Sequence, residues 1–304
     1  MTASPSSPAR TGALMTLGSM CFAQLGLGLS VGLFDQAGAQ GTVWLRLAWA
    51  GVLLLALVRP RPSWFTRSGL AACVLLGVVT AAMMTLFVAA VERLPLGTAS
   101  ALEFLGPLTV AVARGRRGGA LWPVLAAAGV LLLTEPWHAG ADPAGVAFAL
   151  GAAACWAAYI LLTQRVGDEA SGIRALAVTL PVAALVTTPF AGPSTAGRLS
   201  WQLLLAGLGL AVLLPVLPLV LELLSLRLLT TAAFGTLMAL EPAIAVLVGL
   251  VLLHEVPGAG AVTGIVLVVA AGVGAERGGA RAGVPAPAVE GGPVHPAERR
   301  EAVR

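Results

Sequence analysis

Ser100-Ala-Leu-Glu-Phe-Leu-Gly-Pro-Leu-Thr-Val-Ala-Val112 places one carboxylate, that of Glu103, inside an otherwise apolar run of residues. Ala239-Leu-Glu-Pro-Ala-Ile-Ala-Val246 repeats the pattern with Glu241. An acid in an apolar segment is costly, and it is found mainly where it has a function. The two stretches therefore raise the hypothesis that one helix with a functional acid occurs twice in the chain.

The composition of the whole chain is that of a membrane protein. The 304 residues are 58% hydrophobic and only 11% charged, and the mean hydropathy is +0.92. A water-soluble domain of this size could not carry so apolar a surface. Apolar stretches of roughly 18 to 24 residues recur, each long enough to cross a hydrocarbon core of about 30 Å as a helix. We predict an all-α membrane protein with ten spans, at 12–34, 41–58, 69–91, 96–114, 119–135, 143–164, 173–191, 201–224, 232–253 and 258–276.

A repeated motif indicates that the ten spans form two copies of a five-helix unit. Met20-Cys-Phe-Ala23 resembles Ala154-Cys-Trp-Ala157, and the separation of these motifs nearly equals that between Pro107 and Pro242. Because five is odd, the two copies must enter the membrane in opposite directions. Such an inverted repeat is typical of carriers, in which interchangeable halves give states open to opposite sides. The predicted units are an N-terminal tail at 1–11, repeats at 12–137 and 138–276, and a disordered Gly- and Pro-rich tail at 277–304.

The arginines of the predicted loops give the orientation, because cytoplasmic loops retain basic residues. With the N-terminus inside, the outer loops carry only Arg93 and Arg198. The inner loops then carry Arg59, Arg61, Arg67, Arg114, Arg116, Arg117, Arg165, Arg174 and Arg227. Both termini are therefore predicted to be cytoplasmic. The bias toward Ala, Gly, Val, Leu and Arg hints at a GC-rich bacterial genome, and the predicted location is a bacterial cytoplasmic membrane.

The two acids are the first candidates for a functional site. By helix rise, Glu103 and Glu241 lie within roughly 3 Å of the centres of their spans. At this depth a carboxylate costs about 2.5 to 3.5 kcal/mol and must face the bundle interior or a water-filled cavity. The pair could bind a substrate amine, carry a coupling proton, or do both. The alternative is that each acid is protonated and only bonds a neighbouring helix.

Prolines near the acids predict interrupted helices. Pro107 removes the helical hydrogen bond to the carbonyl of residue 103, and Pro242 does the same for residue 238. Pro215 and Pro218 add further breaks in the eighth span. Carriers coordinate cations and substrate at such interruptions near the membrane centre.

Two further charged residues are candidates with an open alternative. Arg46 lies five residues inside the second span, and it could snorkel to the surface, pair with a carboxylate, or meet a substrate carboxylate. Glu222 lies near the inner end of the eighth span, close to Arg227. It could form an interfacial ion pair with that arginine or serve as an acid at an inner gate.

Several uncharged side chains complete the predicted substrate or proton site. Trp156 and Tyr159 are three residues apart and share one face of the sixth span, and Gln24 lies in the matching region of the first. Met84 belongs to a polar and polarizable cluster with Thr80, Met83 and Thr85. Helix packing through threonine explains this cluster about as well as a small-molecule cavity does.

Other classes of function lack their motifs. The sequence has no aspartate-rich metal motif, no Gly-rich phosphate loop and no Ser/His/Asp set, so we expect neither an enzyme nor a cofactor or metal site. The net charge of +4 is spread over short loops rather than gathered on one face, which argues against nucleic-acid binding.

Three stretches resemble EamA-type carriers of the drug/metabolite transporter superfamily. Leu221-Glu-Leu-Leu-Ser-Leu-Arg227, followed by Phe234-Gly-Thr-Leu-Met-Ala-Leu-Glu-Pro-Ala-Ile-Ala245, resembles the second-half signature of these carriers. Ala101-Leu-Glu-Phe-Leu-Gly-Pro-Leu-Thr-Val-Ala111 resembles their branch of bacterial threonine/homoserine exporters. Arg46 matches an arginine that such proteins carry early in the second span. The resemblance implies two inverted five-helix repeats around a central cavity, with the fifth and tenth spans at the periphery.

The resulting hypothesis is a secondary transporter that exports small metabolites, such as the amino acids threonine and homoserine, by proton-coupled alternating access. Its expected partners are a small-molecule substrate, protons and the lipid bilayer, and a homodimer is left open. A carrier of another solute, such as a drug-like cation, purine or sugar, is one alternative. A non-transporting membrane scaffold is another.

Overall fold

Helices make up all regular structure in the residues that the computed structural model describes, which are 8–114, 121–134, 142–167, 172–225, 228–229, 234 and 237–279. In chain order the elements are α1 (Pro8–Val31), α2 (Phe34–Ala37), α3 (Ala39–Val58), the 3-10 turn η1 (Pro62–Trp64), α4 (Arg67–Val91), α5 (Leu96–Glu103), α6 (Leu105–Arg114), α7 (Leu121–Thr134), α8 (Pro143–Gly167), α9 (Gly172–Ala196), α10 (Trp201–Ala211), the π-helical η2 (Val212–Val216), α11 (Leu217–Ser225), α13 (Glu241–Leu252) and α14 (Ala259–Gly279).

Six helices within these ranges are long and apolar enough to cross a membrane: Pro8–Val31, Ala39–Val58, Arg67–Val91, Pro143–Thr163, Ile173–Ala196 and Trp201–Glu222. Leu121–Leu133, Glu241–Leu252 and Ala259–Gly274 are apolar but shorter. Outward-facing apolar side chains are well exposed, with Leu185 at 70% and Val251 at 69%. Helices that contact lipid chains are expected to expose such side chains. The predicted class, an all-α membrane protein, is confirmed for this part of the chain.

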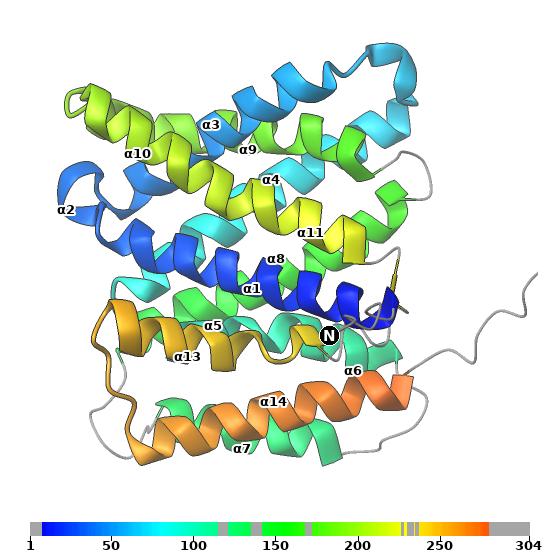
Figure 1. Cartoon of the computed structure of the whole chain (residues 1–304), viewed down its shortest axis with the longest axis vertical. Helices are drawn as coiled ribbons and strands as arrows, with labels where there is room; N and C mark the ends of the chain where they lie inside the picture. The colour runs from blue at the N-terminus through cyan, green and yellow to red at the C-terminus, as the bar shows by residue number, and fades with distance from the viewer. Residues whose placement is uncertain are drawn as a thin grey trace, which may run out of the picture.

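The helices lie side by side, with their axes across the long dimension of the molecule (Figure 1). Extensive contacts pair α4 with α8, α3 with α9, α7 with α14, α1 with α11, and α5 with α13. The α7–α14 pair forms one end of the molecule, as the family resemblance implies for the fifth and tenth spans, and α3 and α9 lie at the opposite end (Figure 1). Helices α1, α4, α8 and α11 lie between these ends.

Glycine allows some of these helices to approach closely. A Cβ atom on Gly106 of α6 would collide with the backbone carbonyl of Ala153 on α8. Gly129 of α7 and Gly264 of α14 lie against each other's backbone, and a Cβ on either would meet the carbonyl of the other. Small residues at such crossings are the usual means by which membrane helices pack.

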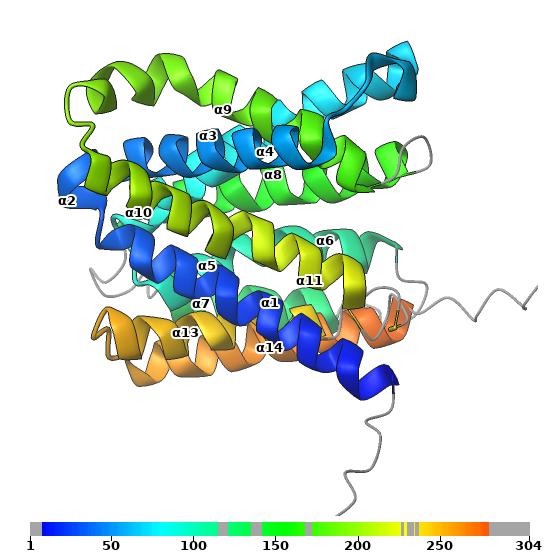
Figure 2. The same cartoon turned by 45° about the horizontal axis from the view of Figure 1, so that its top comes forward.

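The beginning of α1 and the end of α14 lie on the same side of the molecule, the right-hand side of Figures 1 and 2. Helix α1 begins at Pro8, inside the predicted tail 1–11, because proline is well suited to the first turn of a helix. Helix α14 continues to Gly279, three residues beyond the predicted last span. The rest of the predicted tail lies outside the described residues.

The fourth predicted span is not one helix, because α5 ends at Glu103 and α6 begins at Leu105. Phe104 forms the turn between them, and its carbonyl accepts a hydrogen bond from the amide of Leu108 at 3.2 Å. Pro107 has no N–H to donate to the carbonyl of Glu103. Glu103 therefore stands at the carboxyl end of a half-helix.

The ninth predicted span is interrupted before Glu241. Residues 237–238 are helical and residues 239–240 form a turn, so α13 begins only at Glu241, with Pro242 in its first turn. Proline suits this position because its missing N–H needs no helical partner there. Most of 230–236 lies outside the described residues.

The eighth predicted span is interrupted as well. The π-helical segment η2 contains Pro215, and Leu214 has the extended angles φ −155° and ψ 111°. Pro218 follows in the first turn of α11. Three predicted spans thus have their irregular backbone close to a proline.

Candidate functional site

Helix α1 places two polar side chains against two of the predicted acids. Ser19 donates a hydrogen bond from Oγ to Oε1 of Glu222 on α11 at 2.8 Å. Nε2 of Gln24 donates to Oε1 of Glu241 on α13 at 3.2 Å. Ser19 and Gln24 are almost fully buried, whereas the two acids are only partly buried. Both acids therefore face α1 in the interior rather than lipid.

Glu103 and Glu241 are close enough for their charges to interact, and the charges of Glu241 and Glu222 interact as well. The packing of α5 against α13 brings the first pair together. Glu241 lies at the positive, amino end of α13, whereas Glu103 lies at the negative, carboxyl end of α5. Three carboxylates in one low-dielectric region cannot all be ionised without a counter-cation. This cluster is suited to binding a proton or an organic cation.

Glu222 forms no ion pair with an arginine among the described residues. Its predicted partner Arg227 lies outside the described residues, and the hydrogen bond from Ser19 is the contact that the structure gives the Glu222 carboxylate. The hydroxyl of Tyr159 on α8 lies within electrostatic reach of Glu222 and is hydrogen-bonded to Thr163. Glu222 therefore extends the acid cluster toward α8.

Arg46, the predicted site residue on α3, is buried. Only 1% of its surface is exposed, which argues against the alternative in which it snorkels to the membrane surface. Its guanidinium donates to Ser30 Oγ at 3.4 Å and contacts the Met84 sulfur at 3.8 Å. No described carboxylate lies within ion-pair distance of it, since the one ion pair among the described residues joins Arg93 to Asp142.

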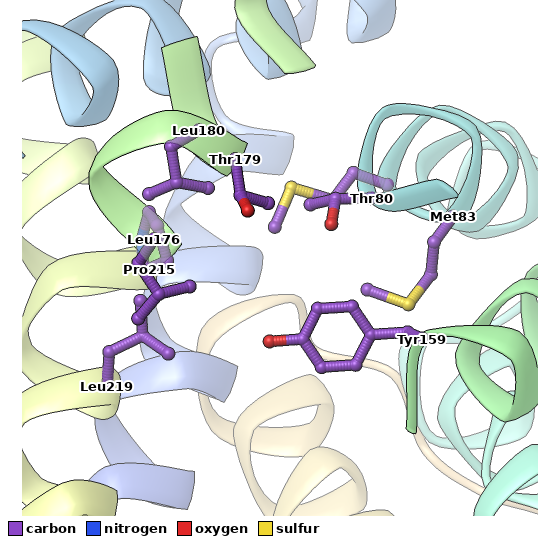
Figure 3. Close-up of a pocket in the computed structure, with 9 residues that line it drawn as sticks. Thr80, Met83, Tyr159, Leu176, Thr179, Leu180, Pro215 and Leu219 are labelled. Carbon is purple, nitrogen blue, oxygen red and sulfur yellow. The ribbon is translucent and has the colours of Figure 1, made fainter. Parts of the chain in front are cut away.

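A small pocket lies between five helical elements (Figure 3). It encloses about 60 Å³ and is lined by Thr80, Met83 and Met84 of α4, Tyr159 of α8, Leu176, Thr179 and Leu180 of α9, Pro215 of η2, and Leu219 of α11. Figure 3 shows Tyr159 extending across the pocket with its hydroxyl toward Pro215 and Leu219. The walls are mainly apolar, and threonine and tyrosine hydroxyls provide the polar groups.

The structure thus brings together most of the predicted site residues in two groups. Glu103, Glu241, Glu222 and Gln24 form the acid cluster, and Met84, Tyr159 and Pro215 line the pocket. Trp156 instead packs edge-to-face on Phe104, with ring centroids 6.4 Å apart and planes at 78°. It therefore supports the turn after Glu103 rather than lining the pocket.

Three contacts were missed by sequence reasoning: those of Ser19, Ser30 and Thr179. Serine and threonine also pack membrane helices or bond their own backbone, so their presence in a span does not distinguish a site. Ser30 illustrates the point, because it bonds both Arg46 and the carbonyl of Gly26 in its own helix. A signal was available for two of them, since Ser19 and Ser30 are eleven residues apart and therefore share one face of a helix.

Some polar atoms of the site are buried without a hydrogen-bond partner among the described residues. Oε1 of Gln24 and Oε2 of Glu241 are two such acceptors, and they belong to side chains already bonded to each other. Nε of Arg46 is a buried donor without an acceptor among the described residues. The hydroxyl of Ser100, one turn before Glu103, is also buried without a partner there. Unpaired buried polar atoms are rare and often mark a place for a ligand or water.

Comparison with known proteins identifies the family. Residues 143–274 match the EamA-like transporter family. The chain is 39% identical to the threonine/homoserine exporter RhtA of Salmonella typhimurium (strain LT2) over 246 residues, which cover 80% of this chain and 83% of the relative. The chain belongs to the EamA-like transporter family.

Further relatives agree with this membership. The threonine/homoserine exporter RhtA of Escherichia coli (strain K12) is 38% identical over 247 residues, or 80% of this chain and 83% of that protein. A solved crystal structure with a TM-score of 0.56 and 16% identity covers 87% of this EamA-family chain and 96% of its own, which supports the fold. The predicted resemblance is confirmed, and the family is one of transporters rather than enzymes. Membership and relatives together support a small-molecule exporter.

Proposed function

We propose that this EamA-family protein is a secondary carrier that exports small amino acids, threonine and homoserine among them. The names of the relatives support this substrate class. The acid cluster supports it independently, because carboxylates in a membrane interior recognise an ammonium group.

One observation carries the proposal. Gln24 and Glu241 are hydrogen-bonded to each other, yet each keeps a buried acceptor oxygen that has no donor among the described residues. A primary ammonium has three N–H donors, so it can satisfy two acceptors on neighbouring side chains at once. A buried pair of open acceptors is therefore suited to a substrate amine, and a proton can occupy Glu241 when the amine is absent.

Competition between the proton and the amine provides the coupling. Glu103 repels a second negative charge at Glu241, so the pair holds a cation in every state: a proton or an ammonium group. Release of substrate outside is then accompanied by proton binding, and the reverse exchange occurs at the inner surface. The carrier works as an antiporter without a separate ion site.

The helix contacts support an inverted repeat as the basis of alternating access. In the predicted repeat, α1 corresponds to α8, α3 to α9, α4 to α11, α5 to α13 and α7 to α14. The contacts α3–α9, α5–α13 and α7–α14 therefore join corresponding helices, and the contact α4–α8 corresponds to the contact α11–α1. A two-fold relation between the halves produces this pattern of contacts. It gives two states of similar energy that open to opposite sides.

Polar contacts between the halves support a closed outer side in this state. Arg93 donates to Asp142 at 2.8 Å, and Glu255 accepts a hydrogen bond from the amide of Leu96 at 2.9 Å. The hydrogen bond from Arg93 lowers the pKa of Asp142, so this contact persists as an ion pair at neutral pH. Both contacts lie where α5 and α8 begin, on the side opposite the beginning of α1 and the end of α14 (Figure 1). From the loop arginines, we assign the side of these two helix termini to the cytoplasm of a bacterial cell.

The test is transport by purified protein in proteoliposomes. With an acidic lumen and a neutral exterior, the wild type is expected to accumulate labelled L-threonine while protons leave. Glu241→Gln and Glu103→Gln are expected to reduce this gradient-driven accumulation at least tenfold, because neither variant can exchange a proton at the mutated position. The exposed Glu92 supplies the matched control, and Glu92→Gln is expected to transport as the wild type does.

The outcomes separate the parts of the proposal. Unchanged gradient-driven transport in both acid variants means that the coupling role is wrong. A wild type that exchanges a purine, a sugar or a drug-like cation but no amino acid means that the substrate class is wrong. Absence of any solute exchange favours the scaffold alternative.

A further inference from the structure

Arg46 is a buried cation that the described part of the protein leaves without a counter-ion. Its side chain is 1% exposed, and a hydroxyl and a thioether are the polar groups that its guanidinium contacts in the described structure. Its Nε has no hydrogen-bond partner among the described residues. A charge buried in this way is expensive unless something pairs with it during the working cycle. A carboxylate is the group that the planar guanidinium fork matches best.

Helix α1 contacts both this cation and the acid cluster. Ser30 contacts Arg46, and Gln24 contacts Glu241 six residues earlier on the same helix. Six residues of α-helix correspond to about 9 Å along the axis and a rotation of about 240°, so the two contacts lie at different depths and on different sides of α1. An α-amino acid has its ammonium and carboxylate groups close together, and each can make a hydrogen bond of about 2.8 Å. A bound amino acid with one such bond at each end spans roughly the same length as the rise along the axis.

The pocket adjoins Arg46 at one end and Glu222 of the acid cluster at the other. Met84 both lines the pocket and contacts the Arg46 guanidinium. At the other end, Tyr159 lines the pocket and its hydroxyl lies within electrostatic reach of Glu222. The hydroxyls of Thr80 and Thr179 are turned toward the pocket in Figure 3. Each of these hydroxyls already donates to a backbone carbonyl, that of Leu76 or Cys73, so it can only accept a hydrogen bond from a substrate hydroxyl.

We propose that Arg46 binds the carboxylate of the substrate and thereby selects zwitterionic amino acids over simple amines. The inference rests on the proposed function, because it assigns the second charged group of the same substrate. Arg46 and the Gln24–Glu241 pair then hold the two ends of the zwitterion, and the side chain of the substrate enters the pocket. An amine without a carboxylate leaves Arg46 unpaired and is bound less tightly.

The experiment compares L-threonine with threoninamide, which keeps the ammonium and side chain but has no carboxylate. Competition against labelled L-threonine in counterflow gives the ratio of their half-inhibitory concentrations. The wild type is expected to favour L-threonine at least tenfold. Arg46→Gln is expected to bring the ratio close to one, measured with labelled threoninamide if exchange of L-threonine is too slow. Arg198→Gln, at an exposed position in a loop, is the matched control and is expected to keep the wild-type ratio.

Melting temperature distinguishes recognition from a structural role. Removal of an unpaired buried charge does not destabilise the ligand-free protein, so Arg46→Gln is expected to melt at or above the wild-type temperature. L-threonine is expected to raise the melting temperature of the wild type but not that of Arg46→Gln. Arg46→Lys keeps the charge without the planar fork and is expected to give an intermediate ratio.

Two results overturn the inference. One is a wild-type preference for L-threonine that persists in folded Arg46→Gln. The other is a melting temperature of ligand-free Arg46→Gln well below that of the wild type, which assigns Arg46 to the structure. Failure of the proposed function is recognised separately, because wild-type liposomes then exchange no L-threonine at all.

Discussion

At the scale of single residues, the properties of the site depend on the neighbours of each acid. Glu241 has Gln24 as a hydrogen-bond donor and two acids nearby, whereas Glu222 has the Ser19 hydroxyl. The open acceptor of Gln24 makes this amide part of the site rather than only a support for Glu241. Gln24 is therefore the residue whose replacement tests the local geometry.

Gln24→Leu removes one acceptor for the substrate amine and the donor to Glu241. Hydrogen bonds to charged groups contribute about 1.5 to 3 kcal/mol, so affinity for L-threonine is expected to fall roughly tenfold or more. Isothermal titration of the purified protein measures this change. Gln202→Leu, on an exposed face of α10, is the matched control. Equal affinities of the two variants would show that Gln24 does not contact the substrate.

The charged residues of the candidate site were predictable from the sequence, whereas its serine and threonine hydroxyls were not. Glu103, Glu241 and Arg46 are rare in apolar segments, so each one is a signal by itself. Ser19, Ser30 and Thr179 are common types there, and their roles depend on which helices pack together. The lack of a described carboxylate beside Arg46 likewise could not be predicted from the sequence, because it depends on how α1, α3 and α4 pack.

At the scale of helices, the acids are positioned by interruptions and by close packing. Prolines predicted that the fourth, eighth and ninth spans would be irregular near residues 107, 215 and 242. They could not place the ends of the helices, because the turn at Phe104 comes three residues before Pro107 and α13 begins one residue before Pro242. Tertiary contacts determine where a weakened helix breaks.

The contact of α6 with α8 holds the segment that follows Glu103. Gly106→Ala would place a Cβ against the backbone carbonyl of Ala153, which cannot move aside as a side chain can. Overpacking of this kind costs about 1 to 3 kcal/mol, so a lower melting temperature and reduced transport are expected.

Gly209→Ala on α10 provides the control for this substitution. A Cβ at Gly209 meets nothing within 4 Å. Alanine in a helix is favoured over glycine by up to about 1 kcal/mol, so this variant is expected to be slightly more stable. If both variants melt alike, the α6–α8 contact does not constrain the site.

At the scale of the whole molecule, the contacts pair helices from the two predicted halves. The acid cluster takes Glu103 from the first half and Glu222 and Glu241 from the second, and the pocket also has walls from both. Hydropathy could predict that the chain is made of apolar helices, because it depends on local composition. The assembly of one site across the halves depends on packing between distant segments.

The central claim is that a proton and the substrate ammonium compete for the same carboxylates. Titration of the purified wild type with L-threonine, in two buffers of different ionisation enthalpy, counts the protons released on binding. About one proton is expected to be released per bound L-threonine in the wild type, and none in the double variant Glu103→Gln/Glu241→Gln. Binding of L-threonine to the wild type without proton release, or equal release by the double variant, would contradict this claim.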